Sequence, residues 1–278
     1  MLRVSSYLIG QVDSLGLWAL ATVEYTIKVL GMIYFSIRAT ICDQAQGIRS
    51  VVPVISTQVY FTGVQALPLI SVLALASGSI VVMQSNVRLS LLGGPEIIGD
   101  LLVMIIVREI SPLLTALVVI ARSGTAVASE LGNMKVNHEI EALELMGINP
   151  LSYIVFPRLV GGVLSVLALA FYFIIISLIS GFLVSSLIHS IPFMFYLESL
   201  ARAFFMEDVL LFLAKNTFSG AIIFVVCCYQ GLLVRWGPEE VPQATTKAVM
   251  NSIIYVTVFN LSVTSLFYFN KFTRFGVI

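Results

Sequence analysis

Charged residues are scarce in this chain of 278 residues. Only 11% of the residues are Asp, Glu, Lys or Arg, whereas 59% are hydrophobic, and the mean hydropathy is +1.02. Soluble domains carry about 25% charged residues, so a soluble fold of this size would lack the polar surface that it needs. The formal net charge is zero and no basic patch dominates, which argues against a nucleic-acid partner. These observations indicate a polytopic membrane protein.

Residues and motifs for metal, nucleotide and hydrolytic chemistry are also scarce. The chain has two His and three Cys, and it contains neither a Walker phosphate loop nor a Gly-x-Ser-x-Gly elbow. His138-Glu139 lacks the second histidine of a zinc-protease helix. The adjacent Cys227 and Cys228 lie in an apolar run, where we expect small buried hydrophobic side chains. We therefore predict no catalytic residues, no metal site and no cofactor bound by this chain.

Long apolar segments are abundant by contrast. Because a membrane-spanning helix needs about 20 mostly apolar residues, the sequence predicts an all-α fold with five spans. The predicted spans cover residues 66–84, 97–121, 159–188, 218–234 and 249–269. We assign the whole chain, 1–278, to one domain, with a transmembrane bundle from about residue 51. No secretory signal peptide is recognised at the N-terminus.

The N-terminal segment Ser14–Ile37 is ambiguous. It is long enough to span, but Glu24 and Lys28 lie four residues apart in its middle. A helix in the membrane interface, with this charged stripe in water, explains the pattern, and a sixth span is the alternative. We predict an interfacial segment over about residues 1–50. With five spans and a cytoplasmic N-terminus, more Lys and Arg fall on the inner side than on the outer side, as the positive-inside rule requires.

Two adjacent charges, Arg108 and Glu109, lie inside the second predicted span, and Pro112 follows them. Each charge costs about 2.5–3.5 kcal/mol at the bilayer centre on insertion scales. Since adjacent helical residues point in different directions, we expect at least one of the two to meet another helix or a ligand. Pro112 removes the N–H that would reach the Arg108 carbonyl. The pair is interpreted either as a buried ion pair that fixes helix packing or as a polar patch on a substrate path.

Two further polar residues in predicted spans are weaker candidates. Lys215 is interpreted as marking the outer end of a span, with its ammonium group reaching the surface. Asn260 is interpreted as joining two helices by a hydrogen bond. The preceding outer segment, His189–Asp208, mixes aromatic and charged residues and predicts an amphipathic piece at the outer interface.

The inner loop between the second and third predicted spans, Ala121–Pro150, contains a sharply delimited amphipathic helix. Acidic residues lie near its start, apolar residues recur at helical spacing, and a glycine and then a proline end it. Such a helix is either an ordinary connection on the membrane or a docking element for a soluble partner. The residues predicted to form it are the cap Asn137, then Glu139, Ile140, Glu141, Leu143, Glu144 and Met146, and the stop Gly147.

The longest of these motifs resembles a known family. The run from Arg108 to Met134, with Glu141–Pro150 and Pro157-Arg158, closely resembles the MlaE (YrbE) family, the permease subunits of MCE-type ABC transporters. Shorter matches are Thr62–Pro68, Cys228–Gly231 and Ala244–Val249, and together they cover roughly residues 60–270. The chain departs from the family pattern in two places. Residues 235–243 stand where a Gly-rich loop is common, and Asn260 stands where the last span often has an acid.

The resemblance implies an interfacial N-terminal helix, five spans and a homodimer. It implies two copies of a cytoplasmic ABC ATPase, which would bind ATP and Mg and receive the 137–147 helix as a coupling helix. It also implies an MCE-domain partner and a phospholipid cargo in a cavity near Arg108 and Glu109. The location implied is the inner membrane of a double-membraned bacterium or a related organelle envelope. A secondary transporter or channel without an ATPase is the alternative, although no convincing internal repeat is visible.

Overall fold

The computed structural model describes residues 20, 23–40, 48–92, 98–189, 192–235 and 237–274, and within these ranges it contains helices and short turns but no strand. A helix covers residues 23–40. The following elements are α2 (Ile48–Thr62), η1 (Val64–Ala66), α3 (Leu67–Leu92), α4 (Ile98–Leu102), η3 (Val103–Ile110), α5 (Ser111–Val119), η4 (Ile120–Gly124), α6 (Thr125–Val136), α7 (Glu139–Leu145), η5 (Leu151–Val155), α8 (Phe156–His189), α9 (Phe193–Ala203), α10 (Met206–Leu232) and α11 (Glu240–Arg274).

The prediction of an all-α protein with five spans is confirmed for the described residues. Five helical segments are long and apolar enough to cross a membrane, and each is longer than the sequence predicted. They cover Val52–Ser85, Gly99–Val136, Leu151–Leu187, Met206–Leu232 and Glu240–Phe269. The protein is therefore an integral membrane protein.

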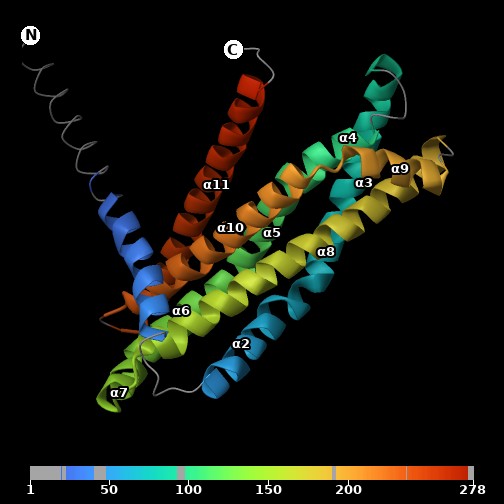
Figure 1. Ribbon diagram of the computed structural model, residues 1–278. Coiled ribbons are helices and arrows are strands. Elements are labelled where there is room, and N and C mark those ends of the chain that lie inside the picture. The colour runs from blue at the N-terminus through green and yellow to red at the C-terminus, as the bar shows by residue number, and fades with distance from the viewer. Residues whose placement is uncertain are drawn as a thin grey trace, which may run out of the picture.

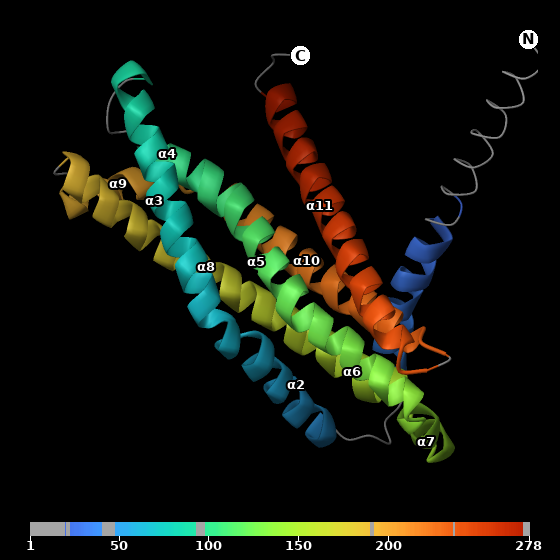
Figure 2. The same cartoon turned by 180° about the vertical axis from the view of Figure 1, so that it is seen from behind.

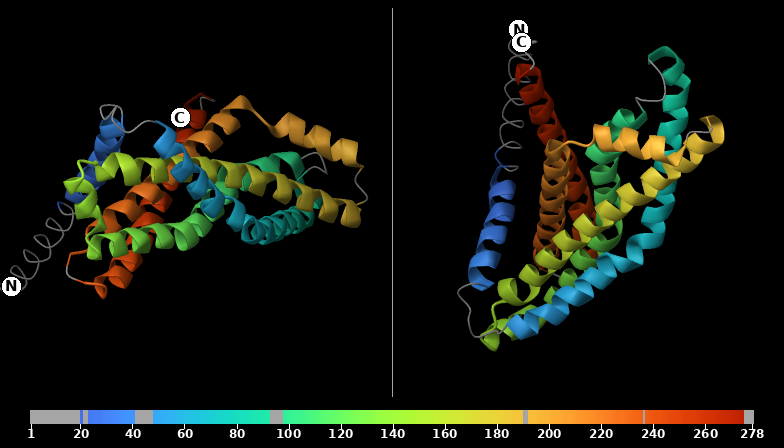
Figure 3. Two further views of the ribbon diagram at one scale, coloured as in Figure 1. Left: turned by 90° about the horizontal axis from the view of Figure 1, so that it is seen from below. Right: turned by 45° about the vertical axis from the view of Figure 1, so that its right-hand side comes forward.

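The long helices form a bundle with different features at its two ends (Figures 1 and 2). The short helix α7 lies at one end, where α6 gives way to η5 and α8. Helix α9 lies at the opposite end, across the bundle and at a steep angle to α10 (Figure 3). Helix α11 leans away from the other helices toward its C-terminal end (Figure 1). Its most apolar stretch is the least buried of the five, with only 17% of that window buried within the chain.

Helices α3 and α8 pack closely because small residues line their contact. A Cβ added at Gly78 of α3 would collide with the Ser177 carbonyl oxygen of α8. Near it, the Ser79 hydroxyl lies 2.7 Å from that of Ser180. Small residues allow close approach of helices in lipid, and hydroxyls then bond across the interface.

The helix over residues 23–40 packs on the α7 end of α10 and α11. The Tyr25 ring meets Tyr229 edge-on at 5.3 Å and stacks on Tyr255 at 5.8 Å, and the Gln230 amide donates to the Tyr25 hydroxyl at 2.9 Å. Glu24 and Lys28, four residues apart, form an exposed ion pair of 2.6 Å. The first residues of Ser14–Ile37, and residues 41–47 before the predicted bundle, lie outside the described residues. Whether this helix lies in the interface, and the boundary at about residue 50, stay predictions.

The inner loop is shorter than predicted. Residues from Ala121 to Val136 continue the second span as η4 and α6, and only the residues after Val136 leave it. The reason is tertiary packing, because Val127, Ala128 and Leu131 are buried on one face of α6, which contacts α10 and α11. Charged and hydroxyl residues are typical of a loop, but here all of them except the buried Ser123 lie on partly covered or exposed faces of one continuous helix.

Replacing Gly78 with Ala should destabilise the bundle by about 1–3 kcal/mol or more, because the added methyl group overlaps backbone that cannot easily move. The measurement is the melting temperature of the purified protein in detergent. Gly31→Ala is the matched control, since its Cβ would find its nearest neighbour 3.9 Å away and alanine favours the helix. Equal melting temperatures for the two variants would contradict the tight contact.

Candidate functional site

Arg108 and Glu109 lie in a π-helical segment of the second span. Element η3 has eight residues in this wider helical form, and Pro112 follows in the first turn of α5. π-helical turns are rare and are frequent at functional sites. Because proline has no N–H, Pro112 cannot donate to the Arg108 carbonyl, as the sequence predicted.

Lys215 of α10 takes the place of that missing donor. Its Nζ donates to the Arg108 carbonyl oxygen at 2.6 Å, to the Thr264 hydroxyl of α11 at 2.7 Å and to the Glu109 carboxylate at 3.1 Å. An ammonium group has three donors, so all three are used. The Lys215 side chain is 0% exposed. The prediction that Lys215 reaches the surface is therefore wrong, because the fold offers its ammonium group three acceptors inside the bundle.

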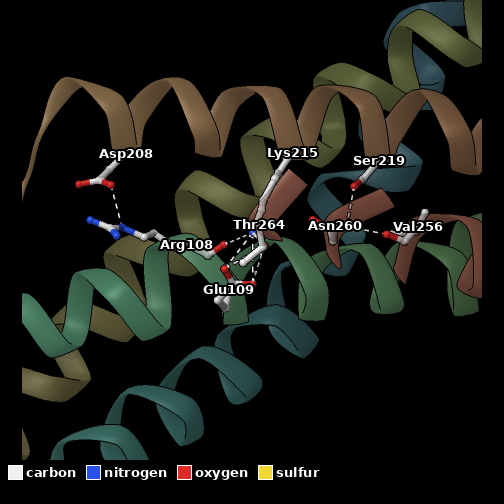
Figure 4. Close-up of polar contacts among 8 residues, drawn as sticks. All are labelled: Arg108, Glu109, Asp208, Lys215, Ser219, Val256, Asn260 and Thr264. Carbon is white, nitrogen blue, oxygen red and sulfur yellow. Dashed lines mark hydrogen bonds and ion pairs between the residues drawn. The ribbon is translucent and has the colours of Figure 1, made fainter. Parts of the chain in front are cut away.

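Arg108 points the other way along α10 and pairs with Asp208 (Figure 4). Its Nε lies 2.7 Å from Asp208 Oδ1, and its guanidinium carbon lies 5.4 Å from the centroid of the Phe267 ring of α11. The Asp208 side chain is fully buried and its other oxygen accepts from the Phe205 backbone N–H at 3.2 Å. Asp208 thus caps the start of α10, where a negative charge is favourable, and also neutralises Arg108.

These contacts form one cluster, which we name the charge cluster and define as Arg108, Glu109, Asp208, Lys215 and Thr264. It joins η3, α10 and α11, and its two positive and two negative charges cancel. The Thr264 hydroxyl also donates to Glu109 at 3.0 Å. The most accessible charged side chain of the cluster is Glu109, with 33% exposure.

A second polar contact lies one turn further along both helices. Asn260 Nδ2 donates to the Ser219 hydroxyl at 3.1 Å, and both residues are buried. Ser219 follows Lys215 by four residues, and Asn260 precedes Thr264 by four, so the two contacts lie above one another along the α10–α11 interface (Figure 4). The prediction that Asn260 joins two helices is confirmed.

Asp208 and Thr264 were not among the predicted site residues. Asp208 was placed in the outer segment before the fourth span, yet it stands seven residues before Lys215, a spacing that puts both on one helical face. That spacing was a usable signal if the helix had been extended back to Met206. Thr264 carries no such signal, because a hydroxyl in an apolar helix is common and its partner comes from a distant part of the chain.

The helix predicted over residues 137–147 exists as α7 (Glu139–Leu145), but its start differs from the prediction. Asn137 ends α6, and His138 occupies the position before α7 with a left-handed φ of 58° and no side-chain cap. The Asn137 amide instead donates to the Glu139 carboxylate at 3.3 Å. The predicted cap is wrong because only two residues separate α6 from α7, so Asn137 closes α6 and His138 takes the position before α7.

The predicted stop at Gly147 is confirmed. Its φ is +76°, its N–H donates to the Glu144 carbonyl at 2.9 Å, and the Ile148 N–H donates to the Leu143 carbonyl at 2.9 Å. These two bonds make a Schellman motif, which requires a left-handed residue after the helix.

The surface of α7 is divided between the bundle and solvent. Ile140 is buried and Leu143 is half-buried, whereas Glu139, Glu144, Leu145 and Met146 are exposed. The apolar residues that were predicted at helical spacing therefore do not all pack on the bundle. Ile140 and Leu143 do, but the helix ends before Met146, which is exposed. Glu141 bonds His138 at 2.5 Å and Lys135 at 3.1 Å. These hydrogen bonds, that from His138 first, hold the pKa of Glu141 below its ordinary value.

Comparisons with known proteins agree with this architecture. A family model described as Permease MlaE matches residues 55–266. A probable ABC transporter permease protein of Rickettsia conorii is 32% identical over 213 residues, 76% of this chain and 82% of its own. A probable ABC transporter permease protein of Synechocystis is 31% identical over 60% of this chain and 64% of its own. Protein TRIGALACTOSYLDIACYLGLYCEROL 1, chloroplastic, of Arabidopsis thaliana is 30% identical over 64% of this chain and 51% of its own.

Removing one partner of the Lys215–Glu109 pair should destabilise the protein, and the loss should depend on which partner is removed. Glu109→Gln leaves a buried ammonium group without its counter-charge and should cost about 3–5 kcal/mol, as for other broken buried pairs. Lys215→Met leaves a carboxylate that is one third exposed, so the loss should be smaller. The double variant should cost less than the sum of the two.

The measurement is the free energy of unfolding in mixed micelles, arranged as a double-mutant cycle. Lys28→Met, which breaks the exposed pair with Glu24, is the matched control and should change stability by about 0–1 kcal/mol. Additive effects of the two cluster substitutions would show that the pair is not coupled.

Proposed function

The chain belongs to the MlaE permease family, and on that premise we propose that it is the membrane subunit of an ATP-driven transporter of phospholipid or related lipid. Membership makes it a permease subunit of the ABC transporter type. The proposal adds the lipid cargo, an MCE-domain partner and a separate ATPase that binds ATP and Mg. The observation that carries the proposal is the charge cluster. It lies within a membrane span, and Arg108 and Glu109 begin the longest motif that resembles the family.

An apolar cargo is supported by the face that α11 turns away from the bundle. Most of this helix is uncovered within one chain, and its exposed side chains are large and apolar: Met250, Ile254, Val258, Leu261, Leu266 and Phe269. In a membrane such a face meets lipid tails or another copy of the chain. We propose that two copies form a homodimer and that lipid lies between them. The name of the Arabidopsis relative contains that of a glycerolipid, trigalactosyldiacylglycerol.

In this proposal Arg108 and Glu109 line the cargo path rather than bind a headgroup as free charges. Arg108 is paired with Asp208 and Glu109 with Lys215, so the charge cluster presents no net charge. Its contact with cargo is made through the exposed third of Glu109. The apolar surroundings then supply the larger part of the binding, as in most small-molecule sites.

We propose that α7 docks the ATPase and that its exposed apolar end makes the contact. Leu145 and Met146 project from the end of the bundle, beside the exposed acids Glu139 and Glu144. Exposed apolar side chains rimmed by polar ones are typical of protein interfaces. This end is then cytoplasmic. We place the protein in the inner membrane of a double-membraned bacterium or a related organelle envelope.

Leu145→Asp should lower recovery of the ATPase at least tenfold, because it places a charge in an apolar contact. The measurement is co-purification of the ATPase with the tagged permease from native membranes. Leu187→Asp is the matched control, since Leu187 is similarly exposed at the opposite end of the bundle. Unchanged recovery with Leu145→Asp would rule out docking through this end of α7. Glu141→Lys with Glu144→Lys tests the acidic side in the same way.

The double variant Glu109→Gln, Lys215→Met should reduce lipid transfer at least tenfold while leaving assembly intact, because it removes both charges together and strands neither. The assay follows labelled phospholipid between vesicles that hold the reconstituted complex. Glu24→Gln with Lys28→Met is the matched control. Normal transfer by the cluster variant would assign the cluster a packing role alone. Transfer by the permease without ATPase or ATP would favour the secondary transporter.

A further inference from the structure

A second polar site lies apart from the charge cluster, toward the α7 end of the bundle. A cavity of about 260 Å³ is lined by α2, α6 and the first turn of α8. Its polar lining residues are Thr57, Gln58, Glu130 and Arg158, and its apolar ones are Val54, Phe61, Ala126 and Val127. Neither Arg158 nor Glu130 contacts the charge cluster in the described part of the chain.

Arg158 is buried in this cavity with a hydrogen bond unmade. Its Nη2 donates to Glu130 Oε1 at 2.8 Å, and its side chain is 10% exposed. Its other terminal nitrogen, Nη1, is inaccessible and has no hydrogen-bond partner among the described residues. Buried donors are nearly always satisfied, and a turn of the Arg158 side chain, which lines the cavity, would bring this donor to a ligand oxygen there.

Glu130 supplies the opposite charge at the mouth of the same cavity. Its side chain is 59% exposed, so its carboxylate can meet a second group while one oxygen accepts from Arg158. A purely anionic ligand would meet repulsion from Glu130, and a purely cationic one would meet repulsion from Arg158. A ligand that carries both signs a few ångströms apart is attracted by both residues.

We propose that this cavity binds the headgroup of a zwitterionic phospholipid, with the phosphate at Arg158 and the ammonium group at Glu130. The volume is below the roughly 300–1,000 Å³ of sites that enclose a whole drug-sized molecule, so it takes the headgroup and leaves the acyl chains outside. Helix α2, which forms one wall, contributes Val54 and Phe61 to the apolar part of the lining. The lipid class follows from the charges of the cavity. The proposed function makes the α7 end cytoplasmic, and on that basis alone the headgroup belongs to a lipid of the cytoplasmic leaflet.

The wall beside Phe61 is held in place by Arg122. Its two terminal nitrogens donate to the Phe61 carbonyl and to the Gln65 side chain, each at 2.6 Å, and its guanidinium carbon lies 4.8 Å from the Phe61 ring centroid. Both of its terminal nitrogens are therefore engaged. Arg122 thus holds the wall of the cavity through both of these nitrogens, whereas Arg158 has one terminal nitrogen without a partner among the described residues.

The test is native mass spectrometry of the full-length protein in detergent, titrated with dioleoylphosphatidylethanolamine or dioleoylphosphatidylglycerol. Wild-type protein should prefer the zwitterionic lipid. Glu130→Gln leaves Arg158 uncompensated and should shift the ratio of the two affinities about fivefold toward the anionic lipid, the size of one exposed charge interaction. Glu198→Gln is the matched control, because it breaks an exposed Glu–Arg pair with Arg202 on α9 and should leave the ratio unchanged.

A structural ion pair would behave differently. It would change both affinities equally or not at all, and either result with Glu130→Gln would overturn the proposal. Ala126→Leu fills the cavity while keeping both charges of the ion pair and should abolish the preference, whereas Ala121→Leu, at an exposed position on the same span, should keep it. Equal binding of water-soluble glycerophosphoethanolamine and the lipid would also overturn it. These measurements need no ATPase, so failure of the transport proposal leaves them interpretable.

Discussion

The buried ammonium group of Lys215 is the constraint around which the middle of this bundle is organised. No water is available in the hydrocarbon region, so each polar group there must find its partner inside the protein. Lys215 does so with the Arg108 carbonyl that Pro112 leaves free, with the Glu109 carboxylate and with the Thr264 hydroxyl. The three partners come from η3 and α11, so one side chain of α10 fixes the relative positions of three helices.

Lys215, which donates to the free Arg108 carbonyl, also neutralises the charge of Glu109. Arg108 and Glu109 are adjacent in sequence and cannot neutralise each other, and α10 supplies one partner for each, two turns apart. Asp208 takes Arg108 near the start of α10, and Lys215 takes Glu109 deeper in the bundle (Figure 4). The expense of placing four charges in a membrane is thereby reduced to that of one neutral cluster, of which Glu109 is the most accessible charged side chain.

One continuous span connects this cluster with the far end of the molecule. The helical stretch Gly99–Val136 carries Arg108 and Glu109 in its first half, and two residues separate its end from α7. Two π-helical segments interrupt its regular winding, η3 at the cluster and η4 at Arg122. In the proposed transporter, a displacement of α7 by the ATPase would act on the rigid α6 and reach the cluster along the same helix. The Arg158–Glu130 pair joins α6 to α8 on this route.

The sequence by itself determined the membrane class, the five spans and a short helix within residues 137–147, because hydrophobic length and helical period are local properties. It also determined that Arg108 and Glu109 need partners, and that Asn260 joins two helices. Only the tertiary structure decided who those partners are. Asp208 and Thr264 lie about 100 and 155 residues away from them, and no local pattern encodes such a pairing. Lys215 shows the same limit, since its position near a span end suited an exposed charge until the fold placed it against Glu109. The length of α6 and the cap of α7 were likewise settled by what packs against them.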